Sequence, residues 1–121
     1  MSTHAEQRRT APADSLVWLD GEALAMRVSP GVHAPSSFTQ ALVAALPRVD
    51  GLHVVDAGCG AGSLTVALLR LGAMHVSASD IVPAALADTL ANARRHTEPD
   101  RVTTLLAPWD GLGDVNADLL V

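Results

Sequence analysis

The sequence predicts an α/β fold in which helices flank a parallel β-sheet, with a β-hairpin ahead of it. Short apolar, valine-rich runs alternate with segments of helical periodicity between residues 52 and 121. Strands and helices that alternate at short spacing form right-handed crossovers, and these build a parallel sheet. A glycine-rich segment at residues 58–62 joins the first of these runs to a helical segment. Such junctions bind ligands at the strand ends of open parallel sheets.

The N-terminal part divides into a tail and a hairpin. Residues 1–14 are polar and lack periodicity, so we expect a disordered tail. Residues 15–35 are expected to form a hairpin and a loop, because Asp20-Gly21 separates two apolar arms and Asp-Gly favours tight hairpin turns. The second arm, 22–28, contains two alanines and a methionine and could instead be a short helix.

A helix is expected from Ser37 to the proline at position 47. Ser37 can cap it, and Gln40 three residues later can complete a capping box. Its expected apolar face comprises Phe38, Leu42, Val43, Ala45 and Leu46.

The remaining elements follow the alternation of strands and helices. Strands are expected at 52–56, 75–79, 102–106 and 117–121, with helices at 63–71 and from 83 to about 96. Gly72 is suited to end the first of these helices, and Pro83 to begin the second. The expected buried faces are Leu64, Ala67, Leu68 and Leu71 on the first, and Ala84, Leu86, Ala87, Leu90 and Ala93 on the second.

Composition excludes several classes of protein. The chain of 121 residues fits one domain, and its 49% hydrophobic and 17% charged content is that of a globular protein. The net charge of −5 and the absence of a basic run do not indicate nucleic-acid binding. One cysteine and scattered histidines do not indicate a metal site. No run is long enough to span a membrane and no signal peptide is visible, so we expect a cytoplasmic protein.

The glycine-rich segment carries the main functional signal. Gly58, Gly60 and Gly62 follow a valine-rich strand, with Asp56 just ahead of them. A nicotinamide-binding fingerprint has the spacing Gly-x-Gly-x-x-Gly, whereas here the third glycine comes one residue earlier. An acid at this strand end suits a ligand that carries an ammonium group, and a pyrophosphate less well. This spacing therefore disfavours a nicotinamide dehydrogenase.

The string Asp-x-Gly-Cys-Gly-x-Gly resembles the first motif of class I S-adenosylmethionine-dependent methyltransferases, which have a Rossmann-like fold. The resemblance implies that Asp56 holds the methionine end of the cofactor, directly or through water, and that the glycines form the loop passing it. It also implies that Asp80, at the next strand end, binds the ribose hydroxyls and that Ile81 packs on the adenine. Asp80 could also cap the helix that begins at Pro83, and both roles can hold together.

Beyond the third strand, the resemblance makes Asp110 the candidate for the adenine amine. Trp109 could stack on the adenine or cover the edge of the core. The cofactor-binding set is therefore Asp56, Gly58, Gly60, Gly62, Asp80, Ile81, Trp109 and Asp110.

Two further segments resemble a subgroup of this class. Residues 32–40 are similar to a segment of release-factor glutamine methyltransferases, and residues 71–76 resemble both that group and ribosomal-protein methyltransferases. Thr39 and Gln40 could reach the cofactor carboxylate or could serve only as helix N-terminal residues. The Asn-Pro-Pro-Tyr segment that holds the acceptor nitrogen in the release-factor subgroup does not occur. We therefore expect residues 36–121 to be an incomplete methyltransferase domain, and no catalytic residue is assigned.

The resulting functional expectation is methyl transfer to a nitrogen of a protein or related substrate. The alternatives are a methyltransferase for a small molecule and a non-catalytic fragment that binds the cofactor. The expected partner is the methyl acceptor, and the oligomeric state is not predicted.

Overall fold

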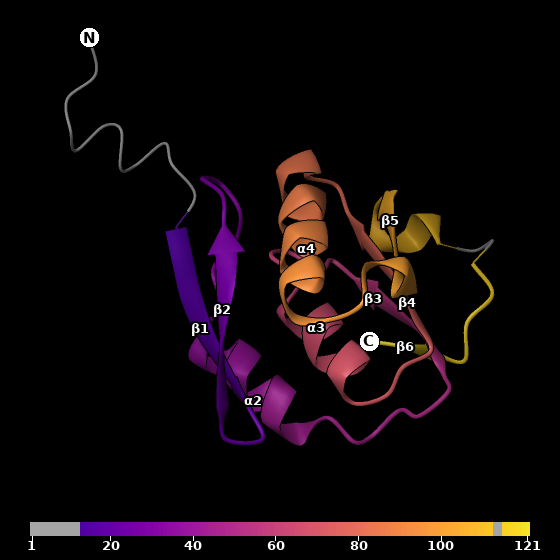
Figure 1. Ribbon diagram of the computed structural model, residues 1–121. Helices are drawn as coiled ribbons and strands as arrows, with labels where there is room; N and C mark the ends of the chain where they lie inside the picture. The colour runs from indigo at the N-terminus through magenta and orange to yellow at the C-terminus, as the bar shows by residue number, and fades with distance from the viewer. Residues whose placement is uncertain (1–12, 113–114) are drawn as a thin grey trace, which may run out of the picture.

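Three layers make up the computed structural model, which describes residues 13–112 and 115–121 (Figure 1). An antiparallel hairpin forms one outer layer. The helices α3 (Ser63–Arg70) and α4 (Pro83–His96) form the middle layer, and a four-stranded sheet forms the third. The helix α2 (Ser37–Ala45) contacts both the hairpin and α3. Because α4 contacts the hairpin as well as the sheet, it is covered from two sides.

The sheet is parallel throughout, which confirms the predicted fold class. Its strands are β3 (His53–Ala57), β4 (His75–Asp80), β5 (Val102–Leu106) and β6 (Leu119–Leu120), and their order in the sheet is β5-β4-β3-β6. The chain therefore runs outward from β3 through β4 to β5 and returns to the other side of β3. Such a reversal of strand order places a crevice at the carboxyl ends of the strands, where open α/β sheets bind ligands.

The predicted hairpin is confirmed, and its second arm is a strand. β1 (Ala13–Leu19) pairs with β2 (Glu22–Val28), and the two residues of the turn both have positive φ, 49° at Asp20 and 78° at Gly21. The first strand begins at Ala13, so the strand includes the last two residues of the expected tail, whereas residues 1–12 lie outside the described part. The hairpin turns four apolar side chains into the core: Val17, Leu19, Leu24 and Met26.

The start of α2 differs by one residue from the prediction. Ser36, and not Ser37, is the N-cap, because its backbone is extended and its side chain accepts the Thr39 N–H at 3.2 Å. Thr39 completes the capping box in place of Gln40, whose side-chain amide pairs with the backbone of Trp18 in β1. The expected apolar face is only partly right, since Val43 is buried whereas Phe38 is 71% exposed and Leu42 is 38% exposed.

The helix α3 buries most of its residues, and Gly72 follows it with a φ of 101°. Its predicted inward residues are buried except Leu64, which is half-buried. A short 3-10 turn, η1 (Pro99–Arg101), precedes β5, and a second, η2 (Trp109–Gly111), follows it. None of the helices in the described ranges has the length and apolar character needed to cross a membrane.

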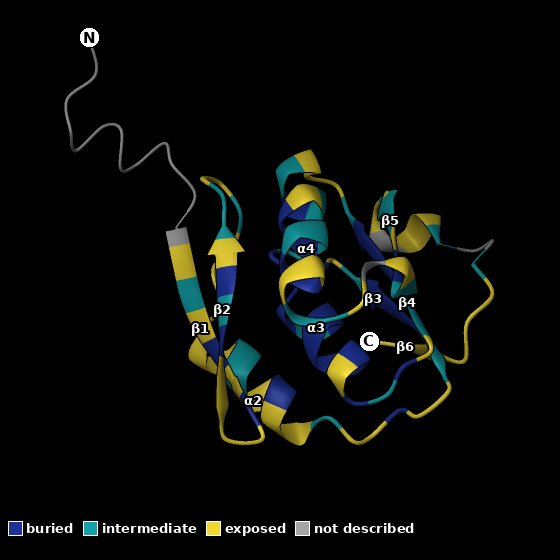
Figure 2. Cartoon of the chain, viewed as in Figure 1, coloured by how far each residue is buried: buried dark blue, intermediate teal, exposed yellow. Residues whose placement is uncertain are grey.

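The predicted buried face of α4 is only partly right; Figure 2 shows that the helix carries buried, half-buried and exposed residues. Ala93 is buried as expected and Ala87 is exposed, whereas the other three residues are half-buried: Ala84, Leu86 and Leu90. The fully buried residues are Ala85, Asp88, Thr89, Asn92 and Ala93. The reason is that α4 lies between the sheet and the hairpin, so that its polar positions meet backbone groups rather than water.

Candidate functional site

A pocket of about 590 Å³ lies at the carboxyl ends of the strands. Every strand of the sheet contributes to it, either with its own last residues or with those that follow directly. The lining residues are Ala57 and Gly58 after β3, Asp80 and Ile81 after β4, Ala107 and Pro108 after β5, and Leu120 and Val121 at β6. The walls are mainly apolar, and Asp80 is the one charged side chain among these residues.

The glycine loop forms one side of the pocket with backbone conformations that L-residues rarely adopt. The φ angles of Gly58, Gly60 and Gly62 are 71°, 56° and 94°. A Cβ on Gly58 would meet nothing within 4 Å, so only its φ requires glycine. A Cβ on Gly62 would lie 2.9 Å from the backbone of Thr89 in α4, so packing requires glycine there as well.

Two backbone groups fix the carboxylate of Asp80, which lines the pocket. Its Oδ2 accepts the N–H of Gly60 and its Oδ1 accepts the N–H of Val82, both at 3.0 Å. Val82, and not Asp80, is the N-cap residue of α4, which corrects the predicted capping role. Each carboxylate oxygen can accept more than one hydrogen bond, so a fixed Asp80 can still bind a ligand.

Asp56 lies on the neighbouring strand but does not line the pocket. Its side chain is 1% exposed, and its Oδ2 accepts a hydrogen bond of 2.7 Å from the Thr65 hydroxyl in α3. Burial raises the pKa of Asp56 to about 6, and the hydrogen bond from Thr65 opposes that rise. The structure thus pairs the Asp56 carboxylate with α3 and leaves it outside the residues that line the pocket.

The other predicted site residues do not share one pocket, and of the two remaining glycines Gly60 borders a smaller hollow whereas Gly62 lines neither that hollow nor the main pocket. Ile81 is 68% exposed and lines the main pocket, as do Asp80 and Gly58. Asp110 lines a neighbouring pocket of about 490 Å³ that also includes Val55 and Asp118. The side chain of Trp109 lies outside the described part of the structure.

Sequence reasoning missed the apolar pair Ala107-Pro108. Ala107 donates its N–H to the carbonyl of Asp80 at 3.1 Å, which brings the end of β5 beside the end of β4. The predicted parallel sheet could have identified this pair, because the residues that follow the strands of a parallel sheet all lie at the same edge of it.

A smaller hollow of about 220 Å³ lies on the other flank of the glycine loop and shares Gly58 with the main pocket. His33, Phe38 and Thr39 line it, whereas Gln40 does not. Cys59 also borders it, but burial raises the pKa of its thiol to about 12, so it is not a nucleophile at neutral pH. In the described ranges, no group of three or more His, Cys, Asp or Glu side chains could hold a metal ion.

The central strand, the Gly-x-Gly-x-Gly loop after it and the acid ending the next strand together define a class I methyltransferase fold. Residues 31–121 match the family described as ribosomal protein L11 methyltransferase (PrmA). The chain belongs to this family.

Individual relatives agree with the family match. The ribosomal protein L11 methyltransferase of Methylococcus capsulatus is 36% identical over 105 residues, which cover 83% of this chain and 35% of the relative. The chain thus spans about a third of the length of the curated relatives it matches. The solved ribosomal protein L11 methylase of Lactobacillus delbrueckii subsp. bulgaricus is 27% identical with a TM-score of 0.62, over 78% of this chain and 50% of that one. The precorrin 8W decarboxylase of Methanobacterium thermoautotrophicum is 28% identical with a TM-score of 0.65, over 77% and 52%.

Proposed function

We propose that this chain supplies the cofactor-binding part of an S-adenosylmethionine-dependent methyltransferase whose acceptor is a ribosomal protein of the L11 type. One observation carries the proposal: Asp80 lines a mainly apolar pocket, and its carboxylate is oriented by the N–H groups of Gly60 and Val82. An oriented carboxylate beside apolar walls suits a nucleoside, which offers hydroxyl donors and a flat ring. The family match supports the same assignment.

The residues present fit the nucleoside part of this cofactor. Asp80 would accept hydrogen bonds from the two ribose hydroxyls, each worth about 1.5–3 kcal/mol because the acceptor is charged. Ile81 and Pro108, from the ends of adjacent strands, would cover the two sides of the adenine. Gly58, which carries no side chain and has open space beside it, would let the ligand lie against the backbone.

The remaining predicted roles differ in their support. Asp56 is buried and paired with Thr65, so we assign it an indirect role through the loop rather than a contact with the methionine end. We do not assign the adenine amine to Asp110, because Asp110 lines the neighbouring pocket. The stacking role of Trp109 stays a prediction.

In methyl transfer, the bound cofactor supplies a methyl group that its sulfonium already activates. The work left to the protein is to hold donor and acceptor in line, and such positioning can contribute about 7–11 kcal/mol in favourable cases. Asp80 and the glycine loop would fix the donor. We assign no catalytic residue.

The nature of the acceptor rests on the relatives. We propose that the acceptor is a protein and that the methyl group is transferred to a nitrogen atom. We also propose that the protein acts in the cytoplasm. The release-factor subgroup that residues 32–40 suggested gains no support from the family match, which is to the L11 group. A small-molecule substrate is the second candidate, because the precorrin 8W decarboxylase to which the chain is similar is named for a small molecule.

Calorimetric titration of the 121-residue chain with S-adenosylhomocysteine, S-adenosylmethionine and NAD tests the proposal. We expect the first two to bind and NAD not to bind, because the loop lacks the spacing for a pyrophosphate. Binding of NAD alone, or of none of the three, would refute the proposed cofactor.

A further inference from the structure

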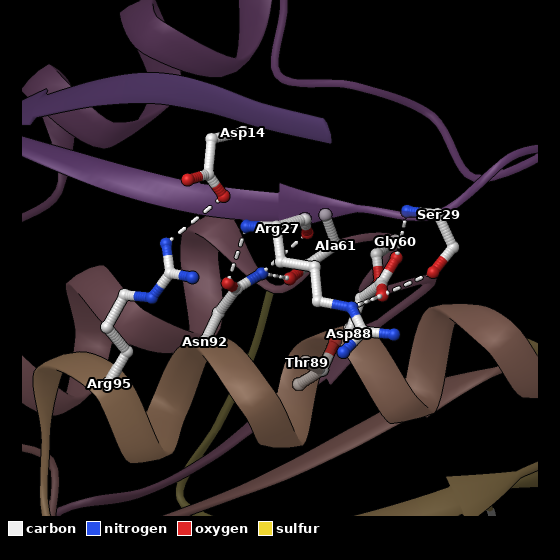
Figure 3. A network of polar contacts seen from close by, with 9 residues as sticks. All are labelled: Asp14, Arg27, Ser29, Gly60, Ala61, Asp88, Thr89, Asn92 and Arg95. Carbon is white, nitrogen blue, oxygen red and sulfur yellow. Dashed lines mark hydrogen bonds and ion pairs between the residues drawn. The ribbon is translucent and has the colours of Figure 1, made fainter. Parts of the chain in front are cut away.

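Three polar residues of α4 are completely buried although none of them lines the pocket. Asp88, Thr89 and Asn92 have no exposed surface and lie on the side of the helix that faces the hairpin and the glycine loop (Figure 3). Burying polar groups costs free energy unless each finds a partner. The partners of these three side chains therefore indicate what they do.

The side chain of Asp88 makes its polar contacts with the second strand of the hairpin and the residue that follows it. Its carboxylate accepts hydrogen bonds of 2.7 Å from both the N–H and the hydroxyl of Ser29, and it pairs with Arg27 at 3.3 Å. These contacts fasten the end of β2 and the residue after it to α4 (Figure 3).

Asn92 joins the hairpin to the glycine loop. Its Oδ1 accepts the N–H of Arg27 at 2.7 Å, and its Nδ2 donates to the Arg27 carbonyl at 2.9 Å and to the Ala61 carbonyl at 2.7 Å. One buried amide thus connects two segments that are far apart in the sequence, and every donor and acceptor that an Asn side chain can readily use has a partner.

Thr89 contacts the loop beside Asn92. Its hydroxyl lies 3.0 Å from the Gly60 carbonyl and 3.2 Å from the Cys59 sulfur, and its backbone and side chain close the space beside Gly62. The same Gly60 donates its N–H to the Asp80 carboxylate. Gly60 therefore links α4 to the proposed ribose acceptor, because its carbonyl is bound by Thr89 and its N–H binds Asp80.

We propose that Thr89 is a positioning residue for the cofactor site: from outside the pocket it fixes Gly60, and Gly60 in turn orients Asp80. Asn92 fixes the next carbonyl of the loop and ties it to the hairpin, which makes the hairpin part of the support for the site. This inference rests on the proposed function for its ligand but not for its geometry, because the hydrogen bonds exist in the protein itself.

The test separates affinity from stability with two substitutions at one position. Thr89→Val keeps the branched shape and loses the hydroxyl, whereas Thr89→Ser keeps the hydroxyl and loses a buried methyl. We expect Thr89→Val to weaken S-adenosylhomocysteine binding by about three- to tenfold, the equivalent of one lost hydrogen bond. We expect Thr89→Ser to bind like the unsubstituted chain even though it is less stable. Binding is measured by calorimetry at a temperature where urea titration shows every variant folded.

Thr97→Val is the matched control. It removes a hydroxyl from the end of the same helix, where Thr97 donates to the Ala93 carbonyl at 2.8 Å and does not touch the loop. It should leave the affinity unchanged. Equal affinity of Thr89→Val and the unsubstituted chain, or equal weakening in Thr89→Ser and Thr89→Val, would overturn the inference.

Amide hydrogen exchange gives a second measurement that needs no ligand. The Gly60 N–H should exchange about tenfold faster in Thr89→Val than in the unsubstituted chain, with no change in Thr97→Val or at the central strand residue Val54. Faster exchange in a chain that binds no S-adenosylhomocysteine would uphold the positioning role and refute the proposed function. Unchanged exchange at Gly60 would refute the positioning role whatever the ligand.

Discussion

Replacing Asp56 with Asn should make the protein more stable at neutral pH, by an amount that depends on pH. Burial raises the pKa of Asp56 from its ordinary 3.8 to about 6. The folded state therefore holds a proton that the unfolded state has lost between these two values, and stability falls as the pH rises through this window. A shift of about two pKa units corresponds to about 3 kcal/mol of stability lost above pH 6. Asn carries no charge and can still accept the hydrogen bond from Thr65.

The assay is urea unfolding of both chains at about pH 4.5 and about pH 7.5, followed by far-ultraviolet circular dichroism. The difference in unfolding free energy between Asp56→Asn and the unsubstituted chain should grow by about 2–3 kcal/mol from the lower to the higher pH. Glu98→Gln, which neutralises an exposed carboxylate, is the control and should show little change. A difference that stays constant, or that shrinks as the pH rises, would show that the burial of Asp56 is not what sets its pKa.

Three further predictions follow from the same site. Asp80→Ala should weaken S-adenosylhomocysteine binding by at least about a hundredfold in calorimetry, because two charged hydrogen bonds to the ribose are lost; an affinity within threefold of the unsubstituted chain would remove the ribose assignment. Gly62→Ala should lower the unfolding free energy by more than about 2 kcal/mol, since strain at positive φ adds to the contact with Thr89. Gly58→Ala, which has the strain without the contact, should cost only about 1 kcal/mol in the same urea titration. Equal losses of unfolding free energy in Gly62→Ala and Gly58→Ala would show that Thr89 moves to accommodate the added Cβ. Cys59 should react with a thiol reagent at about pH 8 only after denaturant is added, because its pKa is about 12 in the folded chain; rapid reaction of the folded protein would contradict its burial.

The order of strands and helices was predictable because the apolar pattern, together with glycines and prolines at the element ends, determines it. The valine-rich run at β3 and the glycines after it place a strand, a loop and a helix with little freedom, and the structure has them within about a residue. The Asp-Gly turn likewise predicted a hairpin, since both turn residues need positive φ. These signals are local in the chain.

The buried face of α4 was not predictable by the same reasoning. Periodicity assigns the apolar residues to the core, yet Asp88 and Asn92 are buried because the hairpin covers that side of the helix. Only the tertiary arrangement provides the backbone groups of Arg27 and Ala61 that satisfy Asn92. The sequence alone does not show whether a polar residue on a helix will find such partners in the folded protein.

Part of the site was predictable and part was not. Asp80 and Ile81 directly follow the strand predicted at 75–79, so their place in the pocket followed from the parallel sheet. The position of Asp110 depended on the course of the chain after β5, where a 3-10 turn leads it into the neighbouring pocket. The pairing of Asp56 with Thr65 required knowing which way the strand faces α3.

The hairpin also determines where this domain can be cut. The family match begins at residue 31, after the hairpin has ended. Yet Val17, Leu24 and Met26 are buried in the common core, and a side chain of this kind contributes about 1.5–3 kcal/mol when fully buried. A chain trimmed to the matched residues would lose these contributions from a total that rarely exceeds about 15 kcal/mol, and it would expose the polar side of α4. The bounds of the family match therefore understate the folding unit, which includes the hairpin from Ala13 onward.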